Sequence, residues 1–491
     1  MIILYNPQSN AARKPILPMS LLALAAQLEG RRAYQIIDGN LDDHPAESIA
    51  RIIRENSAGV LAVTVMPGPQ LLGAIRDCRA IKNRFPHMTV VWGGYFPTQH
   101  PRPCLNAPYV DFALQGHADF AFLAFLEMLE GRLRPSEVPG LAYRDPAGGC
   151  PKQVPAGPVP HPAQLPPFPY HRLPVERYIR NTYLGSRTLP DHTSYGCPFF
   201  CNFCGVVKLV NGRWLAQPAA RIAGNVAMMM RRWNVNAVQF FDNNFFVQEA
   251  RVAEFADRIK TYKIGWWGEG RIDTMLQFDE STWRAMAESG LRMVFLGAES
   301  GSDETLIKIK KQGTASVQKT LAMAQKCARW GIIPEFSFML GNPPNPEKDT
   351  RTTISFIRKL KKINPRAEII LYHYTPVPLQ GELYEAAQKR GFRFPETLEE
   401  WVRPEWQRLA AHRPESRTWF SAGLTNHIRN FEKVLNAYYP TATDIKLGKP
   451  HRLFLRGLSA WRYRLSFYRW PWELRAANRL LKYQRPETSG F

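Results

Sequence analysis

The most restrictive feature of this sequence is an alternation of short apolar runs with amphipathic stretches, which appears in two separate blocks. The apolar runs of the first block are Ile2–Tyr5, Tyr34–Ile37, Gly59–Val65, Met88–Trp92 and Tyr109–Leu114. They lack the polar–apolar alternation of a half-exposed strand, which indicates strands buried on both faces of a parallel sheet covered by helices. We therefore predict an α/β fold, with a doubly wound, flavodoxin-like sheet in residues 1–145.

A second block of alternation extends over residues 188–390. Its expected strands are Thr188–Tyr195, Ala237–Phe241, Ile264–Gly268, Met293–Gly297, Ile332–Leu340 and Glu368–His373. Six strand–helix units predict a partial (β/α)6 barrel, and in such barrels the chemistry takes place at the carboxyl ends of the strands. Residues 391–491 lack the alternation and are expected to form a mostly helical C-terminal region.

The two blocks are separated by a proline-rich segment. Ten prolines occur in the 29 residues from Pro146 to Pro174. Because proline lacks an N–H group and has a restricted φ, this density predicts an extended linker over residues 146–187 that forms neither a strand ladder nor a helix.

Three cysteines provide the strongest chemical signal. Cys197, Cys201 and Cys204 follow the first expected barrel strand with the spacing C-x3-C-x2-C. Three thiolates suit a four-iron, four-sulfur cluster with one iron left open, whereas a structural zinc site normally needs a fourth Cys or His close by. The next cysteine is Cys327, so the pattern favours the cluster and leaves a zinc site as the alternative.

This motif, with the aromatic Phe203 directly before the last cysteine, resembles the radical S-adenosylmethionine (SAM) superfamily. The resemblance implies that the open iron binds the amino and carboxylate groups of SAM. One electron from the cluster would then cleave SAM and yield a 5′-deoxyadenosyl radical, so an electron donor such as flavodoxin or ferredoxin is an implied partner. The cofactors would carry the chemistry, and the barrel would position and shield them.

Residues at later strand ends match segments that contact SAM in this superfamily. The resemblance implies that Asp242 meets the SAM amino group and that Arg271 meets the carboxylate. Together with Phe203, the implied SAM-binding set is Phe203, Asp242, Arg271, Glu299, Ser300 and Gly341. Glu347 comes two residues later than in the usual version of the fifth-strand segment, which leaves its role open.

Residues 1–140 resemble the cobalamin-binding domain that precedes the barrel in one branch of the superfamily. The resemblance lies in the segments Thr64–Gln70 and Val91–Thr98. It implies a cobalamin site that includes Thr64, Gly68, Gln70, Gly93, Gly94 and Gly116. Adjacent glycines at 93 and 94 let the backbone approach a bulky ligand, and the hydroxyl of Thr64 suits the nucleotide tail of cobalamin.

Two departures from known cobalamin folds stand out. The first strand is followed by Pro7-Gln8-Ser9, without the Asp-x-His-x-x-Gly motif that supplies a lower cobalt ligand, so bound cobalamin is expected to lack a lower axial histidine. The segment Gln115–Asp119 replaces the Gly-Glu-Gly-Glu common in the family, so a flavodoxin-like domain without a ligand is the alternative. Candidate cobalt ligands near strand ends are His44, His100 and His117, each of which is otherwise an ordinary surface histidine.

Basic charge is concentrated at the C-terminal end. The chain has a formal charge of +22, and the span from Lys446 to Arg485 contributes +10, with eleven Lys or Arg residues and one Glu. Six aromatic residues between Trp461 and Trp472 lie among these charges. This combination suits a membrane surface or a lipid-like substrate, and also single-stranded nucleic acid, although no nucleic-acid motif is present. The alternative is a tail whose aromatic residues pack on the barrel.

Together these features predict a cobalamin-dependent radical SAM enzyme. The favoured reaction is a C-methyltransferase that moves a methyl group from methylcobalamin to an unactivated carbon of a small or lipid-like substrate. A radical SAM cyclase or oxidative rearrangement enzyme with the same cofactors is the alternative, and a zinc-stabilised protein that binds nucleic acid or membrane is a remote one. Seven cysteines and the absence of a signal peptide or long apolar run predict a cytoplasmic protein. Peripheral membrane contact through the basic C-terminus is one of the alternatives left open for that region.

Overall fold

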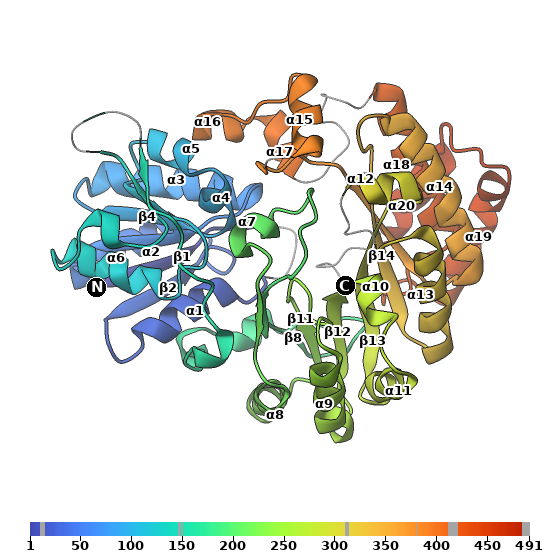
Figure 1. The fold of residues 1–491 in the computed structure, drawn as a ribbon, viewed down its shortest axis with the longest axis horizontal. Helices are drawn as coiled ribbons and strands as arrows, with labels where there is room; N and C mark the ends of the chain where they lie inside the picture. Colours follow the sequence, from blue (N-terminus) through green and yellow to red (C-terminus); the bar gives the residue numbers. More distant parts are fainter. Residues whose placement is uncertain are drawn as a thin grey trace.

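The computed structural model describes residues 1–9, 15–145, 148, 151–309, 314–379, 381–410 and 421–483. Two α/β units lie side by side, and a helical region covers the outer side of the second unit (Figure 1). The α/β class predicted from the alternation is confirmed, with one sheet in each unit. No helix among the described residues combines the length and the apolar character needed to cross a bilayer.

The first sheet has seven strands in the order β2-β1-β3-β4-β5-β6-β7, and its first five strands are parallel. The order 2-1-3-4-5 is that of a flavodoxin-like sheet. Its strands are β1 (Ile2–Asn6), β2 (Tyr34–Asp38), β3 (Val60–Thr64), β4 (Thr89–Gly93), β5 (Phe112–Leu114), β6 (Leu141–Tyr143) and β7 (Lys152–Gln153). The helices of this unit are α1 (Met19–Leu28), α2 (Pro45–Asn56), α3 (Pro69–Arg84), α4 (Tyr95–Gln99), α5 (Pro101–Asn106) and α6 (Ala121–Leu129).

Both faces of this sheet are covered, as the uninterrupted apolar runs predict. Ile3 and Tyr5 of β1 belong to a core shared with α2 and α3, whereas Leu4 belongs to a second core shared with α1 and α6. Successive residues of a strand point to opposite faces, so each face of β1 needs its own helical layer.

The proline-rich segment is more structured than its composition predicts. Of the expected linker, Pro146, Ala147, Gly149 and Cys150 lie outside the described residues. Strand β7 follows them and pairs antiparallel with β6, so the first sheet continues beyond Pro146. The prediction that this segment forms no ladder is therefore wrong. The ladder is possible because β7 is a two-residue strand at the sheet edge that contains no proline itself. Short 3₁₀ turns follow at Pro162–Gln164, Tyr170–Arg172 and Val175–Tyr178.

The second sheet has six parallel strands in the order β15-β14-β13-β12-β11-β8. Its strands are β8 (Thr188–Asp191), β11 (Ala237–Phe240), β12 (Gly265–Gly270), β13 (Leu291–Glu299), β14 (Ile333–Leu340) and β15 (Glu368–His373). Helices follow the strands as α8 (Ala219–Trp233), α9 (Glu249–Ile259), α10 (Ile272–Met275), α11 (Glu280–Glu288), α12 (Asp303–Lys308), α13 (Val317–Trp330) and α14 (Pro346–Ile363). This is the partial barrel that six strand–helix units predict.

The expected strand Thr188–Tyr195 divides in two. Strand β8 ends at Asp191, and the chain then leaves the sheet to form β9 (Ser194–Gly196), which pairs antiparallel with β10 (Trp214–Ala216). The cysteine loop lies between β9 and α7 (Val206–Val210), so this small ribbon supports it from both ends. The apolar pattern missed the break because Thr188–Gly196 is buried except for half-buried His192.

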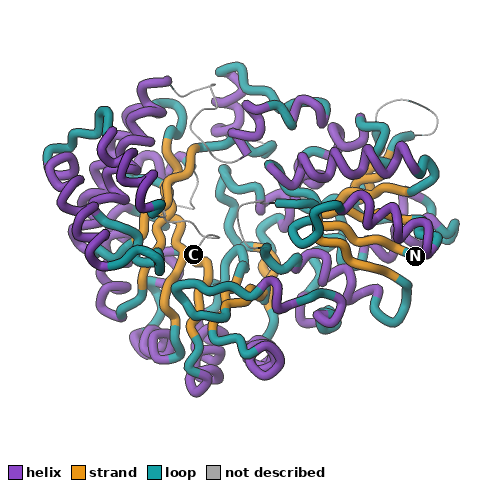
Figure 2. The backbone as a smooth tube through the Cα atoms, turned by 180° about the vertical axis from the view of Figure 1, so that it is seen from behind, coloured by secondary structure: helices purple, strands orange, loops and turns teal. Residues whose placement is uncertain are grey.

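The C-terminal region is helical, as predicted, and contacts both units. Its helices are α15 (Glu382–Lys389), α16 (Leu398–Trp401), α17 (Pro404–Ala410), α18 (Ala422–Tyr438), α19 (Lys449–Arg464) and α20 (Trp472–Leu481). Leu398 and Trp401 of α16 join the core of the first unit, whereas Phe431 and Val434 of α18 join the core of the second. The view from behind shows α15–α17 above both units and the later helices against the outer side of the barrel (Figure 2).

His100 is central to the contact between α16 and the first unit. Its ring centroid lies 4.6 Å from those of Phe394 and Trp401, and burial lowers the pKa of His100 to about 3. Below pH 6.5 the unfolded chain therefore binds a proton at His100 that the folded chain does not, so the free energy of unfolding decreases as the pH is lowered.

We predict that this histidine alone costs about 2 kcal/mol of unfolding free energy between pH 7.5 and pH 5. The variant His100→Phe keeps an aromatic ring in place and should lose that part of the acid sensitivity. Urea unfolding midpoints at the two pH values measure the difference, with the exposed His44→Phe as the matched control. An identical pH dependence in wild type and His100→Phe would contradict the prediction.

Candidate active site between the two sheets

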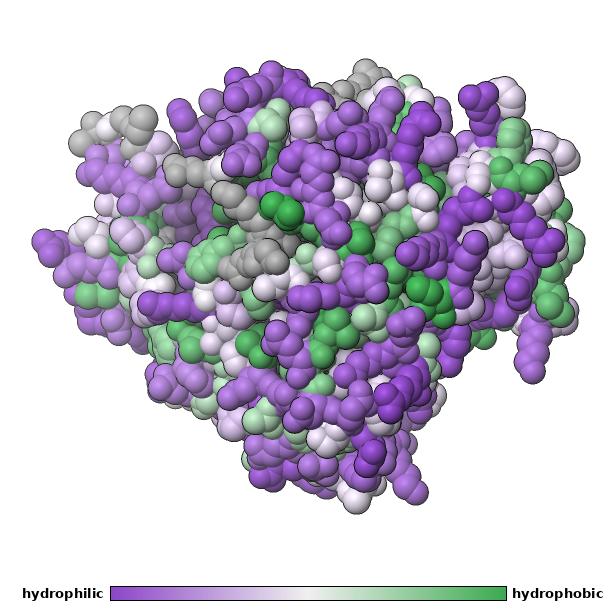
Figure 3. All heavy atoms as spheres, turned by 45° about the vertical axis from the view of Figure 1, so that its right-hand side comes forward, coloured by the Kyte–Doolittle hydropathy of each residue, from purple (hydrophilic) through white to green (hydrophobic). Residues whose placement is uncertain are grey.

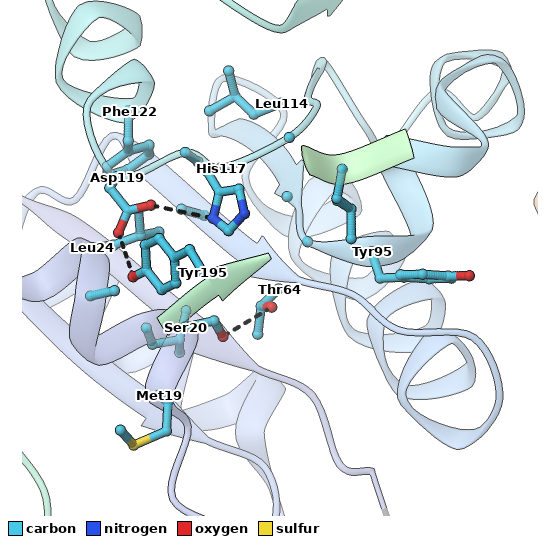
Figure 4. Close-up of a pocket in the computed structure, with 18 of the residues that line it drawn as sticks. Met19, Ser20, Leu24, Thr64, Tyr95, Leu114, His117, Asp119, Phe122 and Tyr195 are labelled. Atoms are coloured by element: carbon cyan, nitrogen blue, oxygen red, sulfur yellow. Dashed lines mark hydrogen bonds and ion pairs between the residues drawn. The ribbon is translucent and has the colours of Figure 1, made fainter. Parts of the chain in front are cut away.

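A cavity of about 240 Å³ lies where the two α/β units meet (Figure 4). One wall comes from the carboxyl ends of β3, β4 and β5, with Thr64, Gly93 and Leu114. The opposite wall belongs to the second unit and consists of His192, Tyr195, Leu209, Val210 and Asn243. Ligands of open parallel sheets bind beyond the carboxyl ends of the strands, and this cavity occupies that position.

Glycines shape the wall formed by the first unit. A Cβ atom on Gly93 would meet nothing within 4 Å, so its missing side chain leaves open space beside the cavity. Gly94 has φ +95°, and a Cβ there would lie 3.1 Å from Thr64 Oγ1. Gly116, with φ +76°, donates its N–H to Thr98 Oγ1 at 3.0 Å. Of the predicted cobalamin contacts, Thr64, Gly93, Gly94 and Gly116 line the cavity.

Gly68 and Gln70 are not among the residues that line this cavity. Gly68 precedes α3 with φ +89°, a conformation that suits glycine. Gln70 is buried, accepts a hydrogen bond from Met66 N at 2.7 Å and donates one to Asn6 Oδ1 at 2.6 Å. In this structure both residues therefore shape the turn after β3, and their contact with cobalamin stays a prediction.

A polar group formed by His117, Asp119 and Tyr195 lines the cavity where the two units touch (Figure 4). Tyr195 donates to Asp119 Oδ1 at 3.0 Å, and its ring stacks on that of His117 with centroids 4.6 Å apart. Burial, together with nearby His192, lowers the pKa of His117 to about 4, so the ring is neutral at pH 7. Burial also raises the pKa of Asp119.

The three histidines considered from sequence now separate by position. His117 lines the cavity, and its Nδ1 lies 3.9 Å from Asp119 Oδ2. His100 packs among aromatic rings at the α16 contact, and His44 precedes α2 at the surface. Neither of those two lines the cavity.

The cysteine loop lies directly beside this cavity. A Cβ on Gly205, which follows Cys204, would lie 2.1 Å from Tyr95 Oη of α4, and Gln99 Nε2 donates to the Gly205 carbonyl at 2.9 Å. The loop also begins under constraint, because Gly196 has φ +88° and a Cβ there would lie 2.2 Å from Arg213 O. Helix α4 of the first unit therefore holds one end of the loop, and β10 holds the other.

The three thiols lie near one another and near a cation. Burial raises the pKa of Cys204 to about 12, and the charges of Cys201 and Cys197 add to this effect. Arg271 Nη1 contacts Cys201 Sγ at 3.5 Å, and its guanidinium lies 3.8 Å from the centre of the Phe199 ring. Among the described residues no three His, Cys, Asp or Glu side chains are arranged to hold a single metal ion.

The predicted SAM contacts Phe203, Arg271 and Glu299 gather around this loop. Arg271 is buried and forms an ion pair with Asp273 at 2.6 Å. Glu299 ends β13 with φ +63°, and its charge acts on Cys204. Phe203 packs against the apolar cluster that includes Leu306 of α12. The structure thus brings these three residues to the cysteine motif, and their contact with SAM stays a prediction.

Asp242 has a different environment from the one expected. It is fully buried, and its oxygens accept hydrogen bonds from Thr193 N, Thr193 Oγ1 and Ser194 Oγ, each at 2.6 Å. Arg251 Nη2 lies 3.9 Å from Asp242 Oδ2. Asp242 therefore holds the bend between β8 and β9, and a bond to a SAM ammonium group would add to or replace these contacts.

Ser300 and Asn342, the residue after Gly341, meet at a carboxylate that sequence reasoning missed. Asp349 of α14 accepts from Ser300 Oγ at 2.9 Å, Thr305 Oγ1 at 2.9 Å and Asn342 Nδ2 at 2.9 Å. Asn342 directly follows Gly341, so Asp349 ties together the turns after β13 and β14. Glu347, whose role was open, is exposed and lies 3.5 Å from Ser421 Oγ.

Two more carboxyl groups, those of half-buried Glu269 and buried Asp191, were missed. Burial and the charge of Asp242 raise the pKa of Glu269 to about 8, and burial raises the pKa of Asp191 to about 6. Glu269 is two residues beyond Trp267, so the side chains of these two residues point to the same face of β12. The Trp267 indole donates a hydrogen bond to Glu335 of β14. Their signal in the sequence was weak, because a lone acid at a strand end is more often a surface charge.

Comparison with known proteins decides the family. A model of the B12-binding domain matches residues 11–126, and a model of the radical SAM superfamily matches residues 192–357. The chain is a radical SAM enzyme with a B12-binding domain. Its cofactors are a [4Fe-4S] cluster, SAM and cobalamin.

Similar proteins cover most of the length of this radical SAM enzyme. An uncharacterized methyltransferase of Pyrococcus horikoshii is 26% identical over 368 residues, which are 73% of this chain and 78% of that protein. Cytidylyl-2-hydroxyethylphosphonate methyltransferase of Streptomyces wedmorensis is 22% identical over 396 residues, 70% of this chain and 73% of its own. The fold resembles that of the radical SAM methyltransferase TsrM of Kitasatospora setae, with TM-score 0.65 at 17% identity, over 98% of this chain and 99% of that one.

The residues present fit these cofactors. Three thiols on one loop, beside the cation Arg271, are a donor set for an iron–sulfur cluster with an open iron. The open space beside Gly93 and the close approach at Gly94 suit a bulky ligand at the edge of the first sheet. The zinc-stabilised binding protein considered from sequence is therefore not favoured.

We predict that Cys201→Ala removes most of the iron and acid-labile sulfide from protein purified without oxygen. Wild type should contain about four irons per chain, the number in a [4Fe-4S] cluster. The matched control is Cys104→Ala, a buried cysteine of α5 outside the loop, which should keep the wild-type iron content. Equal iron in Cys201→Ala and wild type would exclude Cys201 as a ligand.

We also predict that Gly93→Leu blocks cobalamin binding and leaves the cluster intact. The new side chain would extend into space that is empty in this structure, with no backbone strain because φ at Gly93 is not positive. Gly59→Leu is the matched control, since this glycine also has open space around its Cβ position but lies on the surface before β3. Cobalamin retained after gel filtration, measured by its absorbance, should fall sharply only in Gly93→Leu. Normal cobalamin retention in Gly93→Leu would mean that cobalamin binds outside this cavity.

Proposed function

We propose that this enzyme is a cobalamin-dependent C-methyltransferase that methylates an unactivated carbon of a small or lipid-like substrate. The observation that carries the proposal is the shared cavity, in which the B12-binding unit is closed by Tyr195, Leu209 and Val210 of the cluster-bearing segment. When bound, cobalamin would supply the methyl group, and the cluster with SAM would supply the radical that activates the substrate carbon. The methyltransferase names of the two relatives support the same reaction class.

In this reaction the contact between the two units would hold the two reactive centres together. Two reactive centres must be held together with water excluded, because a carbon radical is otherwise lost to side reactions. The hydrogen bond from Tyr195 to Asp119 joins the units two residues before Cys197. Apolar side chains from α1 and α6, including Leu24 and Phe122, line the cavity beside it and exclude water.

Polar side chains would orient the bound cofactors. The Arg271 guanidinium places a positive charge at the cysteine loop, where it stabilises anionic sulfur, and a SAM carboxylate would share it with Asp273. His117 is neutral and offers its ring nitrogens as hydrogen-bond donor and acceptor inside the cobalamin cavity. Glu269, with its raised pKa, is a carboxylic acid able to donate a hydrogen bond inside the barrel at neutral pH.

The proposal is tested with SAM whose methyl group carries deuterium, a strong reductant and cobalamin-loaded protein. We predict that S-adenosylhomocysteine and 5′-deoxyadenosine both form, and that the deuterated methyl group appears on the enzyme's cobalamin by mass spectrometry. Gly93→Leu should lose S-adenosylhomocysteine by at least about tenfold and retain 5′-deoxyadenosine, whereas Cys201→Ala should lose 5′-deoxyadenosine.

Two outcomes would contradict methyl transfer. Formation of 5′-deoxyadenosine without S-adenosylhomocysteine or labelled cobalamin would favour a cyclase or rearrangement enzyme with the same cofactors. Loss of neither product in Gly93→Leu would separate the cavity from the reaction. Gly59→Leu, treated in parallel, controls for general damage to the first unit.

A further inference from the structure

The outer face of α19 and α20 exposes large apolar side chains to solvent. We call this surface the C-terminal face, and its exposed apolar members are Leu453, Phe454, Trp461, Leu465, Phe467, Trp470, Trp472 and Leu480. Trp470 is 74% exposed, Trp472 72% and Leu480 82%. Figure 3 brings this side of the molecule forward and shows apolar side chains among hydrophilic ones along its right-hand margin.

The exposure is built into the fold of this region. Tyr463, Tyr468 and Leu474 are buried in the barrel core, so α19 and α20 are anchored from beneath. Arg462 is buried, forms an ion pair with Glu473 and donates to the carbonyls of Arg469 and Trp470. These bonds hold the turn between the helices in a shape that directs Trp470 outward, with φ +44° at that residue. Aromatic packing on the barrel, the alternative from sequence, therefore applies only to the tyrosines and not to the exposed tryptophans.

Positive charge surrounds the exposed apolar groups. Exposed cations of the C-terminal face are Arg456, Arg464, Arg469, Arg475, Arg479 and Lys482. Within the described residues 446–483 the one acid is Glu473, which is mostly buried against Arg462. Arg485, counted with this charge from the sequence, lies outside the described residues. Each Lys or Arg near an anionic bilayer contributes about 1 kcal/mol of attraction, so this charge favours such a surface.

A basic cavity adjoins the face at Trp470. It has a volume of about 410 Å³ and is lined by Arg351 of α14, by His427 of α18, and by Arg469 and Trp470. Glu347 also lines it. Burial, together with the charges of Arg351 and Arg469, lowers the pKa of His427. A positively charged cavity beside an exposed tryptophan suits the phosphate of a lipid headgroup.

The side-chain types distinguish between possible partners. Single-stranded nucleic acid is bound by aromatic stacking and cations, but the exposed leucines 453, 465 and 480 offer it nothing. A second copy would bring one cationic face against another, which repels. Tryptophan, leucine and arginine together are typical of segments that lie in a bilayer interface, with the apolar side chains at the acyl boundary.

We propose that the C-terminal face docks this enzyme on the surface of an anionic membrane. Trp470, Trp472 and Leu480 enter the interface, and the cavity at Arg351 and Arg469 receives a phosphate headgroup. That cavity lies at the start of α14, directly after the carboxyl end of β14, so docking places the membrane near the catalytic edge of the barrel. The proposal does not depend on methyl transfer, because binding requires no turnover.

The test is co-sedimentation of the full-length protein with two kinds of vesicle. One is phosphatidylcholine alone, and the other is phosphatidylcholine mixed with phosphatidylglycerol. Wild type should bind the mixed vesicles, bind the neutral ones at least about tenfold more weakly, and be released by high salt. Tryptophan fluorescence should shift to shorter wavelength on binding, because the exposed indoles leave water.

Variants assign the binding to the face. Trp470→Ser with Trp472→Ser and Leu480→Ser should weaken binding to the mixed vesicles by at least about tenfold. Arg475→Glu with Arg479→Glu should do the same through charge. The matched control is Leu72→Ser with Leu129→Ser, exposed leucines of the first unit, which should bind like wild type. Circular dichroism of each variant establishes that it is folded.

Three results would overturn the proposal. The first is equal vesicle binding by wild type and the folded Trp470, Trp472 and Leu480 variant. The second is wild type that binds neither vesicle but binds a single-stranded oligonucleotide. The third is wild type that binds neither vesicle and forms a dimer which the same three substitutions disrupt.

Discussion

The buried carboxylate of Asp242 is the interaction on which the arrangement of the site depends. Asp242 lies two residues after the end of β11 and accepts three hydrogen bonds from Thr193 and Ser194, and these bonds turn the chain out of the barrel sheet after β8. A buried carboxylate without such donors would cost several kcal/mol. The bend is therefore strongly favoured, and it directs the cysteine loop away from the barrel strands and toward the first unit.

The loop then becomes the place where the two units meet. Tyr195, on the strand that begins at this bend, donates to Asp119 of the first unit, and α4 packs against Gly205 at the other end of the loop. The cavity at the edge of the B12-binding domain is closed by the same segment. A single contact zone thus determines both the position of the cluster loop and the shape of the neighbouring cavity, which is the arrangement that a reaction shared between two cofactors needs.

Sequence reasoning was reliable wherever a pattern repeats along the chain. Apolar runs predicted both parallel sheets, and the cysteine spacing predicted the cofactor class. It does not decide the role of a residue that has two available partners. Asp242 and Gln70 have the right residue type for a ligand contact, which stays a prediction, and in the structure they also satisfy buried backbone and side-chain groups. Composition also failed in the proline-rich segment, because a two-residue edge strand needs few of the hydrogen bonds that proline removes.

The functional residues that the sequence patterns did not identify have one physical property in common. Asp349 and Glu269 act through neighbours that are distant in sequence, such as Ser300 and Asp242, so no local spacing marks them. His117 and His100 look alike in sequence, yet one lines a cavity and the other packs among aromatic rings. By itself the sequence determined the two sheets, the cysteine motif and the basic aromatic C-terminus, because these are properties of periodicity, spacing and composition. Only the tertiary structure decided which carboxylates are anchors, which histidine lines the cavity and which tryptophans remain exposed, because those outcomes depend on contacts between elements that fold far apart in the chain.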